Sequence, residues 1–186
     1  MSNIFLNFNK LLFLHILIFF IFSCSAGSEE DEKILIEDTF PAVTNNGLTL
    51  GIDDFKLSGF KHLREYKKVD ELPPLMEAHH GIFKKMDYEL RFYASHSEAL
   101  SKGAEDAKLV TGKEGIVTGD VPWEDGEKDR RRCSRAASQP HSGCNYTSKY
   151  ADFVVFENVV VMCEGKDILE SRVSCSNILS LIKTTP

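Results

Sequence analysis

Five cysteines are the residues with the most specific chemistry in the sequence. Cys24 stands alone near the N-terminus, whereas the others, Cys133, Cys144, Cys163 and Cys175, lie in the last third of the chain. Four cysteines in an exported domain indicate up to two disulfides, with three possible connectivities, whereas in a cytosolic protein they suggest a metal site or free thiols. The sequence has no Cys-x-x-Cys pair and no Cys/His cluster at zinc-finger spacing, so we expect no structural zinc site.

The residues before Cys24 suggest why this cysteine stands apart. A run of twelve residues, 11–22, is apolar except for one histidine, and it follows Lys10. This length is typical of a signal peptide and short of the roughly 20 residues that span a membrane. Residues 21–24, Ile-Phe-Ser-Cys, resemble the bacterial lipobox, although the phenylalanine is bulkier than usual. We therefore expect a signal peptide over 1–23 and a lipid on Cys24, whose two or three acyl chains would hold the protein firmly at a membrane.

A small and then acidic stretch follows, and it indicates a flexible tether over 24–32. Two alternatives remain open: a plain secretory peptide cleaved near Ser23 or Ala26, with Cys24 incidental, and an uncleaved anchor. The remainder, 33–186, is long enough for one domain with a single core.

Composition excludes one class of partner. The chain is 42% apolar and 27% charged, as in ordinary globular proteins, and its formal charge is 22 − 28 = −6. Residues 1–23 contain one lysine and no acidic residue, so a mature chain would carry 21 − 28 = −7. Non-specific nucleic-acid binding rests on phosphate neutralisation by basic residues, so we expect no nucleic-acid partner.

The histidines offer two further candidates. His79 and His80 are adjacent, and on a strand they would point to opposite faces, so they are not expected to share a metal ion. His96 lies between two serines at an expected helix start, where a neutral imidazole and backbone N–H groups could bind an anion. The alternative is that the segment around His96 only caps the helix.

The segment 113–151 is long and poor in apolar residues, and such a loop is usually functional or disordered. Trp123, the only tryptophan, is a candidate for binding a ligand or partner. The basic run 128–135, with Arg130 and Arg131, could dock an acidic partner or phospholipid head groups. Acidic residues interleave with it, so a solvated loop of mixed charge is the alternative.

Local patterns predict the elements that would position these residues. Two strand-like runs, 82–84 and 88–94, precede a helix that begins with a Ser-x-x-Glu capping box and covers 95–110. A β-branched hairpin over 153–163 precedes a second capped helix over 167–182. The sequence therefore predicts an α+β fold: two hairpin-plus-helix (ββα) units that form a mostly antiparallel four-stranded sheet with helices on one face.

These elements favour one pairing of the cysteines. Cys163 ends a strand, and Cys175 lies on the core face of the helix that folds back onto it, so we expect a Cys163–Cys175 bridge. Cys133 and Cys144 would then close a small loop. The alternative is that Cys163 and Cys175 are buried free thiols.

No motif nominates a catalytic residue. The sequence contains no G-x-S-x-G, no H-E-x-x-H and no glycine-rich phosphate loop, so we expect no cofactor and no metal.

Residues 91–99, R-F-Y-A-S-H-S-E-A, carry a resemblance to a known family, together with residues 72–74, 150–152 and 158–164. The chain resembles an uncharacterised family of small bacterial lipoproteins with an R-F-Y-x-S-H-x-x-A core, over roughly 60–182. The likeness includes a cysteine after the last strand, which favours its pairing with the strand cysteine. The resemblance implies a location and a fold but no activity.

Together these observations predict an exported lipoprotein of the bacterial cell envelope, anchored to the membrane through Cys24. Its domain would act as a binding or interaction module for a protein or a small-molecule ligand, with 113–151 as the recognition segment. The alternatives are an envelope enzyme or enzyme-inhibitor domain, with its site near that loop, and a purely structural envelope component.

Overall fold

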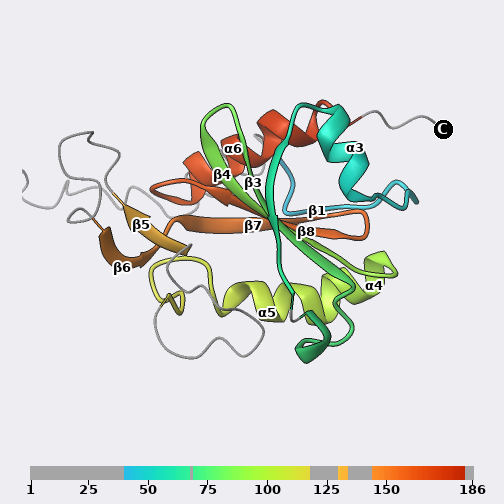
Figure 1. Cartoon of the computed structure of the whole chain (residues 1–186), viewed down its shortest axis with the longest axis horizontal. Helices are drawn as coiled ribbons and strands as arrows, with labels where there is room; N and C mark the ends of the chain where they lie inside the picture. The colour runs from blue at the N-terminus through green and yellow to red at the C-terminus, as the bar shows by residue number, and fades with distance from the viewer. Residues whose placement is uncertain (1–39, 68, 118–129, 134–143, 183–186) are drawn as a thin grey trace, which may run out of the picture. The chain divides into compact units, whose positions relative to one another are not determined.

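A six-stranded mixed sheet organises the part of the chain that the structure describes, residues 40–67, 69–117, 130–133 and 144–182 (Figure 1). The structure is a computed structural model. The strands lie in the order β1-β7-β8-β4-β3-β2, and all neighbours are antiparallel except β1, which pairs in parallel with β7. Their bounds are β1 (Val43–Thr44), β2 (Lys61–Glu65), β3 (Glu77–Phe83), β4 (Met86–Phe92), β7 (Tyr150–Phe156) and β8 (Val159–Glu164). A separate two-stranded sheet consists of β5 (Arg131–Cys133) and β6 (Cys144–Ser148).

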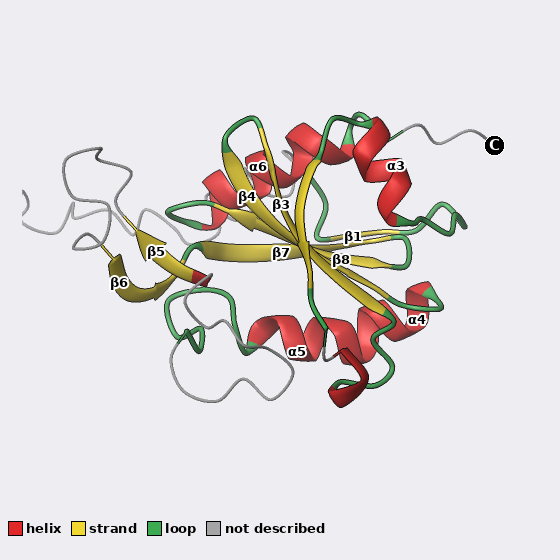
Figure 2. Cartoon of the chain, in the orientation of Figure 1, coloured by secondary structure: helices red, strands yellow, loops and turns green. Residues whose placement is uncertain are grey.

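Helices cover both faces of the six-stranded sheet (Figure 2). On one side lie α3 (Ile52–Leu57) and α6 (Ile168–Leu179), and on the other lies a continuous helical segment of α4 (His96–Glu98), the π-helical η2 (Ala99–Gly103) and α5 (Ala104–Lys108). A short 3₁₀ turn, η1 (Val69–Glu71), precedes β3. Ser95 caps α4 by accepting a hydrogen bond from the Glu98 amide, and Asp167 caps α6 in the same way.

Successive side chains of a strand point to opposite faces of the sheet. Because helices cover both faces, the central strands bury side chains on both sides. Val159 and Val161 of β8 belong to a cluster that includes residues of α3 and α6. Val160 and Met162 of the same strand belong to a second cluster, with Ala107 of α5. The sheet therefore separates two apolar cores.

Two parts of the predicted fold are wrong. The sheet has six strands rather than four, because the edge strands β1 and β2 extend it. The helices do not share one face: the helix after β4 packs on the second core, whereas α6 packs on the first. The broader prediction of an α+β fold with a mostly antiparallel sheet is confirmed.

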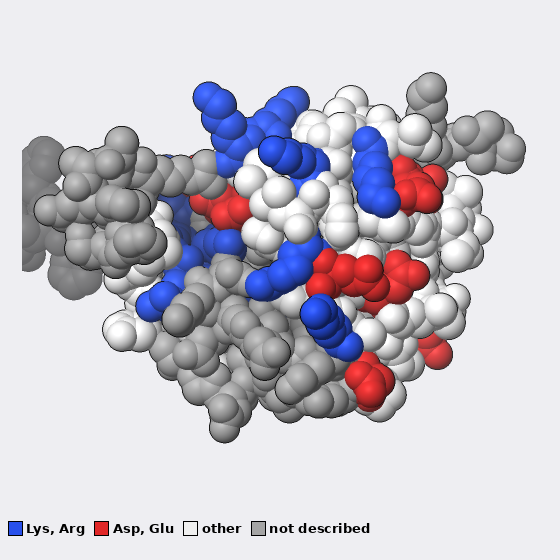
Figure 3. All heavy atoms as spheres, in the orientation of Figure 1, with Lys and Arg blue, Asp and Glu red and all other residues white. Residues whose placement is uncertain are grey.

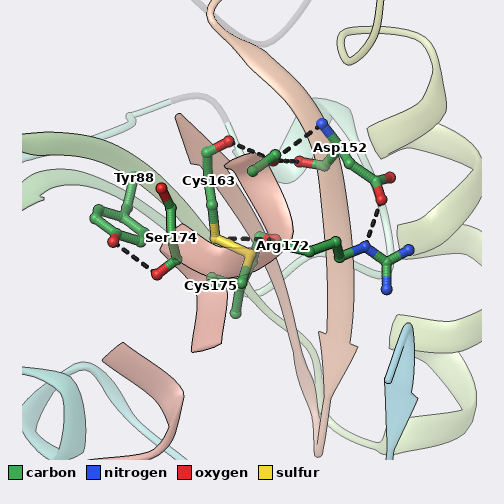
Figure 4. Close-up of a disulfide and its surroundings, with 8 residues drawn as sticks. Tyr88, Asp152, Cys163, Arg172, Ser174 and Cys175 are labelled. Carbon is green, nitrogen blue, oxygen red and sulfur yellow. Dashed lines mark hydrogen bonds and ion pairs between the residues drawn. A yellow bond between two sulfur atoms is a disulfide. The ribbon is translucent and has the colours of Figure 1, made fainter. Parts of the chain in front are cut away.

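A disulfide and several polar contacts fasten α6 to the sheet (Figure 4). Cys163 on β8 is bonded to Cys175 on α6, and both residues are fully buried. The Ser171 hydroxyl donates to the Cys163 carbonyl at 2.7 Å, and Arg172 forms an ion pair with Asp152 on β7. In the described part of the chain, no helix is long and apolar enough to cross a membrane.

Candidate functional site

Three charged side chains lie fully buried on the sheet face that packs against α5. Glu89 and Arg91 are two residues apart on β4 and share this face with Met162 and Val160, their partners on β8. Arg130 immediately precedes β5, and its fully buried side chain reaches Glu89. The Glu89 carboxylate accepts from Arg91 Nε at 2.9 Å, from Arg130 Nε at 2.9 Å and from Arg130 Nη2 at 2.8 Å. Arg130 thus makes a bidentate ion pair with a carboxylate 41 residues away.

The two guanidinium groups keep Glu89 ionised. Burial alone would raise the pKa of this carboxyl group, but the charges and hydrogen bonds of Arg130 and Arg91 outweigh burial and lower the pKa well below its usual range. Tyr66 directly follows β2, and the centroid of its ring lies 5.8 Å from the Arg130 guanidinium carbon. We call Glu89, Arg91 and Arg130 the buried charge cluster.

A second ion pair attaches the chain immediately after β6 to β4. Lys149, between β6 and β7, donates to Asp87 at 3.0 Å, and His80 Nε2 lies 3.3 Å from the same carboxylate. Burial raises the pKa of Asp87, but its contacts with His80 and Lys149 lower it to about 2. The Lys149 amide also donates to the Arg130 carbonyl at 2.8 Å. The segment that contains β5 and β6 is therefore fixed to the sheet at both of its ends.

The β5–β6 hairpin itself is closed by a disulfide between Cys133 and Cys144, which are directly paired in the ladder. The Arg132 guanidinium donates to backbone carbonyls of Ser148, Gly165 and Lys166 and so attaches the hairpin to the end of β8. Tyr146 on β6 is 72% exposed. The hairpin is thus an anchored element that presents an aromatic side chain at the surface.

A family sequence profile matches residues 51–184, and it describes a family of unknown function, DUF6810. The chain belongs to this family. The match spans the buried charge cluster, both disulfides and the hairpin, so these features are all part of the DUF6810 domain. Comparisons with curated proteins and with solved structures give no match.

The structure gives the predicted site residues of the DUF6810 domain different surroundings. Arg130 is internal, whereas Arg131 is half-buried on β5. His96 Nδ1 lies 2.6 Å from the Glu157 carbonyl oxygen, to which it donates a hydrogen bond, so this nitrogen is already engaged. Trp123 lies outside the described residues. Lysine, arginine and acidic side chains are interspersed on the face that Figure 3 shows, so the described charges there are of mixed sign.

The four domain cysteines form the predicted pairs, 163 with 175 and 133 with 144. The two bridges differ in exposure, since Cys163 and Cys175 are fully buried and Cys133 is exposed. Cys24 lies outside the described residues.

The adjacent histidines point to opposite faces. His80 contacts Asp87 on the face of the buried charge cluster, whereas His79 packs against the Phe92 ring of the first core, with ring centroids 5.7 Å apart. Within the described ranges, no group of three or more His, Cys, Asp or Glu side chains is placed to hold a metal ion.

Sequence reasoning predicted the hairpin turn between β7 and β8 but missed the contacts that its two residues make. Glu157 has a positive φ of 56° and is fully buried, and its carboxylate accepts hydrogen bonds from the amides of Asn46 and Leu48. The Asn158 side chain accepts a hydrogen bond from the Leu50 backbone amide and donates one to the Leu50 carbonyl oxygen. An acidic residue in a left-handed turn position that usually carries glycine was the available signal. This turn holds the segment before α3 against the sheet, so its role is structural.

Proposed function

We propose that the protein is an exported, lipid-anchored interaction module whose DUF6810 domain binds a protein partner through the β5–β6 hairpin. The leader, the lipobox-like residues 21–24 and the tether 24–32 support the anchor. Two disulfides support an oxidising compartment outside the cytoplasm.

One observation carries the choice of the hairpin: its two strands are linked to each other or to the six-stranded sheet at three points, while Tyr146 on β6 is exposed. A disulfide closes it, the Arg130–Glu89 ion pair fixes its start, and Lys149 fixes its end. Pre-ordered binding elements lose less conformational entropy on association. Tyrosine and arginine are enriched in protein interfaces, and the hairpin carries Tyr146 in an exposed position.

Metabolic labelling with a fatty-acid analogue tests the anchor. The full chain and its Cys24→Ala variant are expressed in a bacterium that processes lipoproteins, and we expect label on the wild type only. Equal labelling of the two chains would contradict lipidation at Cys24.

Photo-crosslinking in the cell envelope tests the recognition element. A photoreactive amino acid replaces Tyr146 in one chain and Leu57, which is 88% exposed on α3, in a matched control. We expect a discrete adduct of one partner protein from position 146 and none from position 57. Identical adduct patterns from the two positions, or no adduct from position 146, would contradict a role for the hairpin.

A further inference from the structure

Two histidines meet at the edge of the sheet on the face of the first core. His62 lies on the edge strand β2 and His79 on its neighbour β3, so residues 17 apart in the chain are brought together by the ladder. His62 Nε2 is 3.2 Å from His79 Nδ1, and the two rings are nearly perpendicular, at 74°. His62 is half-buried on this edge strand, and His79 is 3% exposed.

A carboxylate fixes which nitrogen of His79 is free to bind. Glu77 Oε2 lies 3.1 Å from His79 Nε2, and an ionised carboxylate only accepts hydrogen bonds, so Nε2 carries the proton. In the neutral ring, Nδ1 then presents its lone pair toward His62. A histidine that donates its other N–H to a carboxylate is the usual arrangement around metal ions, because the carboxylate orients the ring and increases its basicity.

From this geometry we propose that His62 and His79 form a two-histidine binding site for a zinc ion. Two nitrogen ligands of tetrahedral zinc, each about 2.0–2.1 Å from the metal, lie about 3.3–3.4 Å apart. The observed separation of 3.2 Å is close to that ligand–ligand distance, so binding requires only small ring rotations. Imidazole nitrogens favour zinc over calcium or magnesium, which prefer oxygen ligands.

Waters complete the coordination of this site. The described residues place no third protein ligand there, so we expect affinity weaker than that of a structural zinc site. The proton that His62 Nε2 shares with His79 moves to the other ring nitrogen of His62, so each histidine keeps one N–H when the metal binds. His80 takes no part because it faces the other side of the sheet.

Equilibrium dialysis with zinc alone tests the proposal on the full chain purified in detergent. The variants are His62→Gln and His79→Gln, and the matched control is His80→Gln, which removes a histidine adjacent in sequence but on the opposite face. A fourth variant, Glu77→Gln, tests the orienting carboxylate. Circular dichroism verifies that each variant is folded, and His62→Gln, at the half-buried position, provides the decisive comparison.

We expect the wild type and His80→Gln to bind one zinc ion that is lost, or bound at least about tenfold more weakly, in His62→Gln and His79→Gln. Glu77→Gln should weaken binding about tenfold, in line with the loss of an orienting carboxylate. Each variant keeps Cys24 and all histidines except the one replaced. Zinc that binds to residues other than His62 and His79 would therefore bind equally to the wild type and to His62→Gln. Equal zinc binding by the wild type and His62→Gln, or an equal loss in His80→Gln, would overturn the proposal.

Discussion

Replacement of Glu89 by glutamine removes the only carboxylate in the buried charge cluster. The glutamine has nearly the same shape, so the substitution isolates the charge. In the variant, Arg91 and Arg130 keep their positive charges in a fully buried place where a carboxylate had accepted three short hydrogen bonds. We expect a large loss of stability.

The size of this loss follows from the usual cost of breaking a buried ion pair. Removing one partner typically costs about 3–5 kcal/mol, because the remaining charge is left without compensation. The pKa of Glu89 agrees in sign, since Arg130 and Arg91 lower it and the folded state therefore favours the ionised carboxylate. We therefore expect Glu89→Gln to lower the free energy of unfolding by about 3–5 kcal/mol, a large part of the roughly 5–15 kcal/mol of a typical domain.

Urea unfolding at pH 7, followed by fluorescence and circular dichroism, measures this loss. The matched control is Lys56→Met, which removes one charge from a surface ion pair with Asp53, where the two side chains are 46% and 85% exposed. It should change stability by less than about 0.5 kcal/mol. Hydrogen exchange should also accelerate first in 130–133 and 144–148, because Arg130 loses the partner that fixes the hairpin.

A loss below about 1 kcal/mol in Glu89→Gln, comparable to the control, would refute the reasoning. It would mean that the carboxylate is not desolvated or that Arg130 does not depend on it.

Three further predictions follow from the same structure. The pKa values of Glu89 and Asp87 are both lowered in the folded state, so their stabilisation is complete above about pH 5 and is lost as the pH falls toward 2; urea unfolding at a series of pH values should show this decline, and a smaller one in Glu89→Gln. Gly81→Ala should lower the free energy of unfolding by at least about 2 kcal/mol, because the new Cβ would lie 2.3 Å from the Phe60 ring. The control Gly51→Ala, whose Cβ would have nothing within 4 Å, should lower it by at most about 1 kcal/mol as a change of helix cap. Thermal unfolding compares the two variants, and equal losses of stability would contradict the packing at Gly81. Replacing both cysteines of the buried disulfide by alanine should cost about 3 kcal/mol, since the bridge closes a loop of 12 residues, and an unchanged unfolding midpoint in urea would contradict its contribution.

Local sequence signals located the hairpins and the helix starts. The β-branched run before and after the Glu157–Asn158 link predicted a hairpin, and the structure has β7 and β8 there. Ser95 and Asp167 were recognisable as caps because each capping side chain lies three residues before the glutamate whose backbone amide donates to it. Such features depend on neighbouring residues only.

Features that depend on the sheet as a whole were not predictable in this way. β1 has two residues, and a register shift between His62 and Arg64 interrupts β2, so neither shows a clear alternation. The face on which a helix packs is set by the connection after its hairpin, for which the sequence has no local signal. The prediction placed helices on one face of the sheet only, so it did not include a second core on the other face.

The candidate site was the part least accessible to sequence reasoning. Arg130 belongs to a basic run that had the pattern of a solvated loop, and its partner Glu89 lies 41 residues earlier. Trp123, the aromatic binding candidate of this segment, lies outside the described residues, whereas Tyr146 is exposed on β6. A pairing over this distance becomes visible only when both residues are placed on the same face of the sheet.

The most direct test of the proposed interaction module is the crosslinking yield from position 146 relative to position 57 in the cell envelope. Our account predicts one discrete protein adduct that forms from the hairpin position and not from the α3 position. Equal yields and identical adducts from both positions, or no adduct from position 146, would contradict the claim that the β5–β6 hairpin is the recognition element.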